Sequence, residues 1–388
     1  MAAKARVAVV GVGHSRLFRR AEVALGVLGV EAVRLAIEDA GLDPSDIDGV
    51  STAPDQPFEG AGDVDGLNVI SPEFLTQALK LDVAWAQRYV RTVAVGGSLM
   101  GAMHAVASGA CRYAVCVRAL HSPATRRYGH TDPSEASGAG QFRAPYGIFP
   151  PAVFGPMAHA HMHKYGSTRE ELAAFVVRNR DNALQWEYGY WAQYGGQPLT
   201  RDDYLNSRMI SSPLCLFDCD IPVQTVAAFV VTTTERAKDL RHPPAYVLGM
   251  SNRSTVVKKA PMSLEEYVED GQQVARHLWK NAGVGPRDVD VADLYDGFSV
   301  LTPLWAEALG FCGEGDGFAF VANPTLPLNP SSGNLGAGRT HGIGHILESI
   351  LQIQGRSGRR QVPKAEICVA VTNPCNVGFG FVFSKTPN

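Results

Sequence analysis

Apolar runs of strand length alternate with apolar residues at helical spacing along most of the chain. Arg6 to Val12 is a nearly continuous apolar run, which predicts a buried strand. The segment from Ala24 to Ala40 has the periodicity of an amphipathic helix, and Gly41 supplies a stop at its C-terminus. Further short runs at 47–52 and 113–118 predict buried strands. This alternation of strands with helices predicts an α/β fold.

A change of composition interrupts the alternation. Glycine, proline and aromatic residues cluster between Tyr128 and Pro156, and a helix is predicted from about Arg169 to Leu184. We expect Ser167 to cap that helix, with Glu170 reaching back to complete a capping box. The pattern predicts that 125–204 is an inserted loop or lid region. The alternation then resumes, with strands at 226–232, 245–250, 367–372 and 378–384 and a helix at 345–355.

The chain carries nearly the same segment twice. VEAVRLAIEDAGLDPSDIDGV ends at Val50, and GQQVARHLWKNAGVGPRDVDVADLYDGF ends at Phe298. Ala40-Gly41 aligns with Ala282-Gly283, Pro44 with Pro286, and Asp46-Ile47-Asp48 with Asp288-Val289-Asp290, all at one offset. Two distant copies indicate a duplicated domain rather than a solenoid. We therefore expect an N-terminal half of 1–124 plus 205–240, a C-terminal half of 241–388, and a cleft where equivalent strand ends meet.

The composition excludes several classes of function. The 388 residues are 45% hydrophobic and 19% charged with a net charge of −3, so there is no basic surface typical of nucleic-acid binding. No apolar stretch is long enough to cross a bilayer, and the first strand follows the N-terminus without a signal peptide. Seven scattered cysteines without a CxxC pair favour a reducing cytoplasm and argue against structural zinc. We expect a cytoplasmic globular protein.

Two motifs give only weak signals. Gly11-Val12-Gly13 has the start of a dinucleotide fingerprint, but Arg16 stands where its third glycine belongs. His159 and His163 would share a helix face as metal ligands, yet no neighbouring carboxylate completes a site. A place on the helix surface or in its packing is the favoured interpretation of both histidines, and no metal is expected in this chain.

Polar residues follow the second copy's strand and precede its last helix. Tyr295 and Asp296 come where that strand ends, and in α/β folds such positions face the ligand crevice. The segment SSGNLGAGRTHGIGH then begins at Ser331 and carries His341 and His345 around a predicted helix start. Its glycines allow close backbone approach, and the helix start offers N–H donors to an anion or oxyanion. A satisfied, buried histidine is the alternative for each imidazole.

A polar turn joins the last two predicted strands. It begins at Asn373 and contains Cys375, whose thiol becomes reactive if neighbouring donors lower its pKa. A small buried cysteine is the alternative interpretation.

These segments together resemble the thiolase superfamily over essentially the whole chain. The family's first strand and loop resemble VAVVGVGHSRL, and the segment leading into its central repeat strand resembles FDCDIPVQTVAAFVV. The family's Asn-Glu-Ala-Phe or His-Asp-Cys-Phe loop is replaced here by VADLYDGFSV. Its Gly-His-Pro loop is replaced by SSGNLGAGRTHG, and its Cys-x-Gly turn by PCNVGFG. The resemblance implies the thiolase fold. In this fold, duplicated βαβαβαββ halves pack as a five-layer αβαβα sandwich, here with the inserted region.

The departures from the family concern its catalytic residues. Thiolases carry a nucleophilic cysteine at the start of the helix after the third strand, where this chain reads Val95-Gly96-Gly97-Ser98. Arg339 replaces the Gly-His-Pro histidine, with His341 two residues later, and Tyr295 replaces the His or Asn of the preceding loop. Thiolytic cleavage needs the missing nucleophile.

This pattern is similar to the thiolase-like lipid-transfer proteins, and most to the steroid side-chain aldolases among them. The resemblance implies retro-aldol cleavage of a β-hydroxyacyl-CoA, which needs a base and an enolate-stabilising site but no nucleophile. The base can be a tyrosine with a lowered pKa or a histidine. In that scheme Tyr295 handles the hydroxyl proton, His341 and the Gly-rich loop bind the thioester oxygen, and Asp296 orients or polarises its neighbours. His345 and Cys375 are lesser catalytic candidates. The implied substrate-binding residues are Gly97, Ser98, Gly336, Gly338, Arg339 and Asn373.

The resemblance also implies partners. It predicts a homodimer through the first-repeat sheet edge, and a DUF35 protein with an OB fold that would give an α2β2 complex and carry the only zinc. The CoA thioester would be a substrate, and no cofactor is expected in this chain. Two other functions stay open. One is a divergent thiolase or acyltransferase that uses Cys375 or Ser98, and the other is a non-catalytic acyl-CoA or lipid carrier, or a scaffold subunit for the DUF35 partner.

Overall fold

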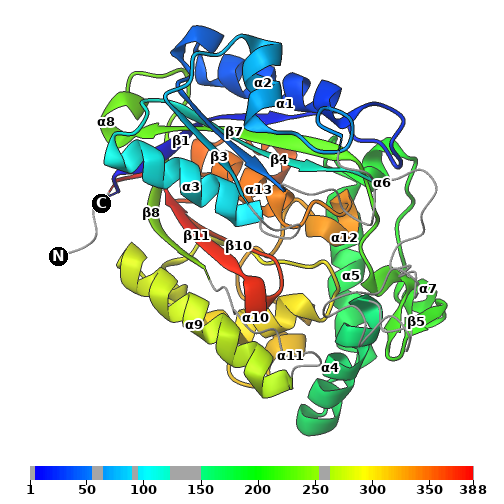
Figure 1. Ribbon diagram of the computed structural model, residues 1–388. Coiled ribbons are helices and arrows are strands. Elements are labelled where there is room, and N and C mark those ends of the chain that lie inside the picture. Colours follow the sequence, from blue (N-terminus) through cyan, green and yellow to red (C-terminus); the bar gives the residue numbers. More distant parts are fainter. Residues whose placement is uncertain (1–4, 55–63, 90–94, 123–149, 253–262, 388) are drawn as a thin grey trace.

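The computed structural model describes residues 5–54, 64–89, 95–122, 150–252 and 263–387 (Figure 1). The strands of the main sheet are β1 (Val7–His14), β2 (Gly49–Ala53), β3 (Trp85–Arg88), β4 (Ala114–Leu120), β7 (Thr225–Thr233), β8 (Ala245–Asn252), β9 (Val291–Asp293), β10 (Ile367–Thr372) and β11 (Phe379–Ser384). Their order is β3-β2-β4-β7-β1-β8-β11-β10-β9. The predicted α/β class is confirmed.

The helices described are α1 (Leu25–Ala40), α2 (Pro72–Leu79), α3 (Val95–Ser108), α4 (Pro150–Tyr165), α5 (Arg169–Ala183), α6 (Tyr190–Gln193), α7 (Arg201–Leu205), α8 (Thr234–Ala237), α9 (Leu264–Ala282), α10 (Leu301–Leu309), α11 (Gly317–Ala322), α12 (Gly333–Ala337) and α13 (Ile343–Gln354). A small hairpin, β5 (Met209–Ser211) and β6 (Leu214–Cys215), stands apart from the main sheet. In these ranges, no helix combines the length and the apolar character that a membrane crossing requires.

The two halves join at the middle of the strand order and form layers. Strands β1 and β8 pair antiparallel through Ala8–Tyr246 and Val9–Ala245. Helices α1 and α2 cover one outer face, α9 and α10 cover the other, and α3 and α13 lie between the two halves of the sheet (Figure 1). These are the layers that the resemblance implies. The apolar core around the middle layer includes Leu99, Met103, Phe229, Ile346, Ile350 and Phe381.

The repeated sequence segment builds the same local structure twice. Helices α1 and α9 both end at a glycine in the left-handed conformation, Gly41 with φ 73° and Gly283 with φ 71°. One carboxylate oxygen of Asp48 accepts hydrogen bonds from the backbone N–H groups of Arg112 (2.8 Å) and Tyr113 (2.9 Å). The repeated aspartates are therefore structural, because these bonds fix the start of β4 beside β2.

Asp290 does the same in the other half. One oxygen of its carboxylate accepts from the backbone N–H groups of Glu366 (2.8 Å) and Ile367 (2.9 Å), at the start of β10. The glycine at the middle of the first strand is also repeated. A Cβ on Gly11 would lie 2.8 Å from Cβ of Ala40, and a Cβ on Gly249 would lie 2.7 Å from Cβ of Ala282. Gly11 therefore serves close packing of strand on helix.

The C-terminal half differs from the N-terminal half at its edge. Where β3 pairs with β2, the segment 327–329 makes a single parallel bridge to β9, between Leu328 and Ala292. The backbone N–H of Ala292 donates to Pro327 O (3.0 Å), and that of Asn329 donates to Ala292 O (2.9 Å). Pro327 has no N–H to extend this ladder back toward the start of β9. Beyond the bridge the side-chain amide of Asn329, not its backbone, bonds to the N–H and carbonyl of Leu294.

The described part of the predicted inserted region, 150–204, consists mainly of helices. The cap of α5 is Thr168, whose hydroxyl accepts from the N–H of Glu171, so the predicted Ser167–Glu170 box is wrong by one residue. Ser167 instead contacts Nδ1 of His161 (2.8 Å), and Nε2 of that buried imidazole lies 2.7 Å from Glu307 of α10. This contact ties α4 to the C-terminal half. His159 and His163 are exposed on α4.

Several predictions fall on residues outside the described ranges. They include the aromatic residues Tyr128, Phe142, Tyr146 and Phe149. Phe154 is described, and its ring packs 4.8 Å from the ring of Phe298.

We predict that Asp48→Ala and Asp290→Ala each lower the free energy of unfolding by about 1–2 kcal/mol, because two backbone N–H groups lose their acceptor. Asp290→Asn is the matched control, since its amide oxygen can still accept both bonds, and we expect it to retain most of the stability. Urea unfolding monitored by circular dichroism measures the difference. Equal stability of Asp290→Ala and Asp290→Asn would contradict this account.

Candidate active site

Three buried loops of the C-terminal half meet in the candidate site. They follow β9, precede α13 and follow β10, and they are buried at nearly every position. Six non-glycine residues in the described ranges have positive φ, and four of them lie in or beside these loops: Asn329 (47°), Ser332 (74°), His341 (54°) and Asn373 (66°). Side chains other than glycine are strained in this conformation, and such strain gathers at functional sites.

The loop after β9 is held in place by Asn329. The amide of Asn329 accepts from the N–H of Leu294 (2.7 Å) and donates to Leu294 O (2.9 Å). Thr302 Oγ1 donates to the carbonyl of the next residue, Tyr295 (3.2 Å). These bonds fix the backbone on both sides of the phenol. The end of the truncated edge segment therefore positions the residue that the sequence singled out.

Tyr295 is buried, with 5% of its surface exposed. Burial raises the pKa of the phenol well above its usual range, and the charges of Asp220 and Asp296 raise it further. Arg339 and Arg118 act in the opposite direction but with smaller effect. The expectation of a lowered pKa is therefore wrong. The phenol is protonated at neutral pH in this structure.

Asp296 caps the short helix α12. Its carboxylate accepts from the backbone N–H groups of Asn334 (2.6 Å) and Leu335 (3.3 Å), and from Nδ2 of Asn179 on α5 (3.2 Å). The carboxylate is fully buried, so these donors replace its hydration. It thus holds α12 and α5 against the loop after β9, as an orienting group does.

His345 lies beside Asp296 and Tyr295. Its Nε2 is 3.1 Å from Asp296 Oδ1, at an angle that does not make a hydrogen bond, and its ring centroid is 6.2 Å from that of Tyr295. The imidazole is fully buried, and within the described ranges neither ring nitrogen has a hydrogen-bond partner. Buried polar atoms without partners are uncommon in folded proteins.

His341 contacts a residue of the N-terminal half. Its Nδ1 lies 2.7 Å from Nη2 of Arg118 on β4, and both side chains are buried. Burial lowers the pKa of this imidazole well below its usual range, and the charges of Arg118 and Arg339 lower it further. His341 is therefore neutral. The geometry brings it, Tyr295, Arg118 and Arg339 into one charged region.

The backbone of the Gly-rich loop is occupied by internal hydrogen bonds. The N–H of Gly336 donates to Ser332 O (3.1 Å), that of Gly338 to Asn334 O (3.0 Å), and that of Arg339 to Ile221 O (2.7 Å). These groups are not available to a thioester oxygen as the sequence led us to expect. The start of α13 is bonded in part as well, since the N–H of Gly342 donates to Asn334 Oδ1 (3.4 Å) and that of Ile343 to Thr340 O (3.4 Å). Its first turn carries no acidic residue, so the positive end of the helix dipole is not neutralised there.

The segment before β7, around residues 220–222, packs beside the Gly-rich loop and the loop after β9. Pro222 pairs with Arg339 in a parallel bridge, and the N–H of Asp220 donates to Gly297 O (3.3 Å). Arg339 and Asp220 are both buried. The segment therefore brings a carboxylate and the Gly-rich loop beside the loop that carries Tyr295.

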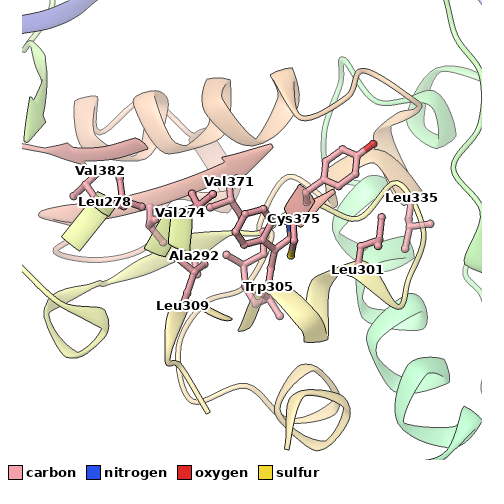
Figure 2. Close-up of a cluster of buried hydrophobic side chains, with 14 of the residues drawn as sticks. Val274, Leu278, Ala292, Leu301, Trp305, Leu309, Leu335, Val371, Cys375 and Val382 are labelled. Atoms are coloured by element: carbon pink, nitrogen blue, oxygen red, sulfur yellow. The ribbon is translucent and has the colours of Figure 1, made fainter. Parts of the chain in front are cut away.

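The turn after β10 carries two polar side chains, Asn373 and Cys375, and both are buried. Cys375 is fully buried in an apolar cluster of the C-terminal half, together with Val274, Leu278 and Trp305 (Figure 2). A Cβ on Gly271 of α9 would lie 2.8 Å from its sulfur, and burial raises the pKa of the thiol well above its usual range. The placement argues against a reactive thiol. The buried side-chain amide of Asn373 has no hydrogen bond within the described residues.

The two residues predicted on α3 lie elsewhere. Ser98 is buried and its hydroxyl donates to Ser51 O (3.0 Å) on β2, with Ser51 Oγ at 3.1 Å, so it is packed on the sheet without a base. Gly97 lines an open groove of about 630 Å³ beside β3, together with Trp85 and Tyr89. Neither Tyr295 nor His341 is among the described residues that line this groove, which reaches the start of β11 at Phe379.

Sequence reasoning missed Arg118, Asn179 and Asp220. Each reaches the site from a different segment, on β4, on α5 and before β7, and the sequence carried no local signal for them beyond their polarity. Across the described ranges, no three His, Cys, Asp or Glu side chains are grouped to hold a metal ion.

Comparisons with known proteins agree with this architecture. Residues 254–377 match the Thiolase C-terminal domain-like family. The chain is 30% identical to a steroid side-chain-cleaving aldolase of Thermomonospora curvata, over 90% of both chains. It is also 30% identical to a 17-hydroxy-3-oxo-4-pregnene-20-carboxyl-CoA lyase of Mycobacterium tuberculosis, over 91% of this chain and 92% of that one.

The solved structures agree as well. An Ltp2-ChsH2(DUF35) aldolase superposes with a TM-score of 0.86 at 28% identity, covering 99% of each chain. The acetyl-CoA acetyltransferase of Bacillus anthracis has a TM-score of 0.70 at 14% identity, which shows the shared fold alone. The chain belongs to the thiolase superfamily, in the branch that contains the steroid side-chain-cleaving aldolases.

Proposed function

We propose that this protein cleaves a β-hydroxyacyl-CoA by retro-aldol chemistry. The substrate class is a steroid side-chain CoA thioester with a 17-hydroxyl group, and the products are a 17-ketosteroid and propionyl-CoA. The names of the relatives support this substrate. The observation that carries the proposal is a buried site that contains the phenol of Tyr295, the neutral imidazole of His341 and the guanidinium groups of Arg118 and Arg339. The thiol of Cys375 packs against α9 and does not face this site.

The reaction needs these groups and no nucleophile. The C17 hydroxyl loses its proton, the C17–C20 bond breaks, and its electron pair moves into the thioester as an enolate. A proton delivered to C20 then completes propionyl-CoA. Negative charge develops on the thioester oxygen, where buried cations and oriented donors stabilise it more strongly than water does.

Tyr295 handles the hydroxyl proton in this scheme, and Asp220 is its acceptor. A buried phenol is a poor resting base, because its pKa is raised. Among the neighbouring charges that raise this pKa, Asp220 has the largest effect. Tyr295 would therefore receive the substrate's proton while passing its own to that carboxylate. Asp296, already fixed by donors from α12 and α5, orients the loop.

His341 binds the thioester oxygen, with the positive end of α13 beside it. A neutral imidazole that accepts at Nδ1 donates at Nε2, as an oxyanion donor must. His345 and Asn373 supply further polar atoms to the same buried region.

The assembly we propose contains a homodimer and a DUF35 partner. Strand β3 ends the strand order and has a sheet neighbour on one side only among the described strands, beside the groove of Trp85 and Tyr89. The similar Ltp2-ChsH2(DUF35) aldolase includes a DUF35 protein in its name. By this resemblance the partner carries a zinc ion, an α2β2 complex forms, and this chain needs no cofactor.

We predict that the chain, co-purified with a DUF35 protein, converts a 17-hydroxy-pregnene-carboxyl-CoA into propionyl-CoA and the 17-ketosteroid. Tyr295→Phe should lower kcat by about 100-fold or more, because the proton loses its carrier. Tyr246→Phe, a buried tyrosine at the start of β8, is the matched control and should keep full activity. Chromatography of both products measures the rate. Binding of the thioester without products in the wild type would favour a carrier.

Asp220→Asn separates two roles of Tyr295. Asp220 raises the pKa of the phenol, so its removal lowers that pKa and increases the phenolate fraction at a given pH. If the carboxylate accepts the proton, as we propose, kcat falls by roughly 100-fold across the pH profile. A rise in activity, with the profile shifted to lower pH, would instead assign the phenolate as a base that acts alone.

Cys375 is predicted to be inert in the native protein. Its thiol is fully buried and its pKa is raised, so iodoacetamide should modify it only after unfolding. Mass mapping of native and urea-treated protein compares it with Cys312, which is partly exposed. An acyl adduct on Cys375 after incubation with acyl-CoA would revive the acyltransferase alternative.

A further inference from the structure

Arg118 joins the two halves of the molecule at the site. It lies on β4 of the N-terminal half, and its Nη2 is 2.7 Å from Nδ1 of His341 in the C-terminal half. A guanidinium group only donates, so Nδ1 must be the acceptor and the ring proton lies on Nε2. The contact thus sets the tautomer of the imidazole, which a histidine alone does not determine.

Burial of the guanidinium group of Arg118 costs folding free energy. Arg118 is 2% exposed, and within the described ranges it has no ion pair and its Nη1 has no hydrogen bond. Burial and the charge of Arg339 lower its pKa to about 9, so it remains charged at neutral pH. A buried cation without a carboxylate partner destabilises the resting protein. Negative charge that develops beside it would offset this cost.

His341 is constrained from a second side. Its backbone has a φ of 54°, which is strained for a side chain with a Cβ. It follows Arg339 and Thr340 in a loop whose N–H groups are bonded to Ile221 O (2.7 Å) and to Asn334 Oδ1 (3.2 Å). The imidazole therefore has a fixed origin and a fixed donor at one nitrogen. Backbone and side chain together direct Nε2–H.

We infer that Arg118 is a positioning residue for the reaction: through Nη2 it holds His341 as a neutral Nε2–H donor, and its charge favours the enolate. This inference rests on the proposed function for the role of His341. Among the described residues, the charges that shift the pKa of His341 belong to Arg118 of β4 and Arg339 of its own loop, and Tyr295 acts on Arg118 in turn. Both arginines oppose protonation of the imidazole.

The tautomer is tested without reference to activity. Solid-state ¹⁵N spectra of protein labelled at histidine, with His341→Gln to identify the signals, report the state of each ring nitrogen. In the wild type we expect Nδ1 to stay an acceptor and Nε2 to stay protonated between about pH 5.5 and 8.5. A His341 signal that titrates near the ordinary pKa of 6.5 in the wild type overturns the inference.

Three substitutions separate the charge from the hydrogen bond. Arg118→Lys keeps both, Arg118→Gln keeps a donor without charge, and Arg118→Met keeps neither. Removal of the charge raises the pKa of His341 toward its ordinary value, so in Arg118→Met the imidazole should gain its proton at higher pH than in the wild type. Arg118→Lys should restore the wild-type spectrum. Identical spectra for all three would also overturn the inference.

Turnover then links the position to catalysis. We expect Arg118→Met to lower kcat on the order of 10- to 100-fold with little change in KM, with Arg118→Gln between Met and Lys. Because Arg118→Met removes a buried charge, its stability to urea should fall much less than its kcat. If Arg118 had only a structural role, stability and kcat would fall together. A variant with altered spectra and unchanged kcat would overturn the positioning role. An inactive wild type with the expected spectra would count against the proposed function alone.

Discussion

Helices α3 and α13 are covered by a β-sheet on both sides, and the rest of the structure follows from this burial (Figure 1). This enclosure buries polar residues as well as apolar ones, since His345, Glu348 and Gln352 of α13 are all buried. The loop that leads into α13 is consequently buried from Ser331 onward. Each polar atom there must find a partner inside the protein or in a ligand. Charges in such a dry region interact strongly.

The fold was predictable because equivalent residues form the same local structure in each half. Asp48 and Asp290 fix the start of a strand, and Gly41 and Gly283 end a helix, so the repeat is visible without any structure. Tyr295 and Asp296 were found for a similar reason, since they follow a strand directly. Arg118 was not found, because its partner lies in the other half and nothing local distinguishes it from the polar end of a strand.

Direction and burial are what the sequence did not reveal. Cys375 lies in the turn that resembles the family's cysteine turn, but its sulfur faces α9 in the outer core. Tyr295 was identified as the residue that handles a proton, but the sign of its pKa shift depends on burial and on Asp220, which approaches from before β7. Both quantities are set by contacts between distant segments. A single sequence shows the two residues that make such a contact, but not that they meet.

Comparison of equivalent positions in the two halves separates fold from chemistry. Ser98 bonds to Ser51, and Ser349 donates to Asp293 Oδ2 (2.6 Å) at the position that the repeat aligns with Ser51, so the middle helices are tied to their sheets alike. The next strand positions diverge. Tyr295 aligns with Ala53, and the strand register aligns Arg118 with Thr372. The halves thus remain alike where they support the layers and differ where their strand ends face each other. One half contributes a phenol and an imidazole, and the other contributes the cation that orients that imidazole. Duplication built the scaffold, and loss of symmetry at its centre provides groups of different chemistry to one substrate.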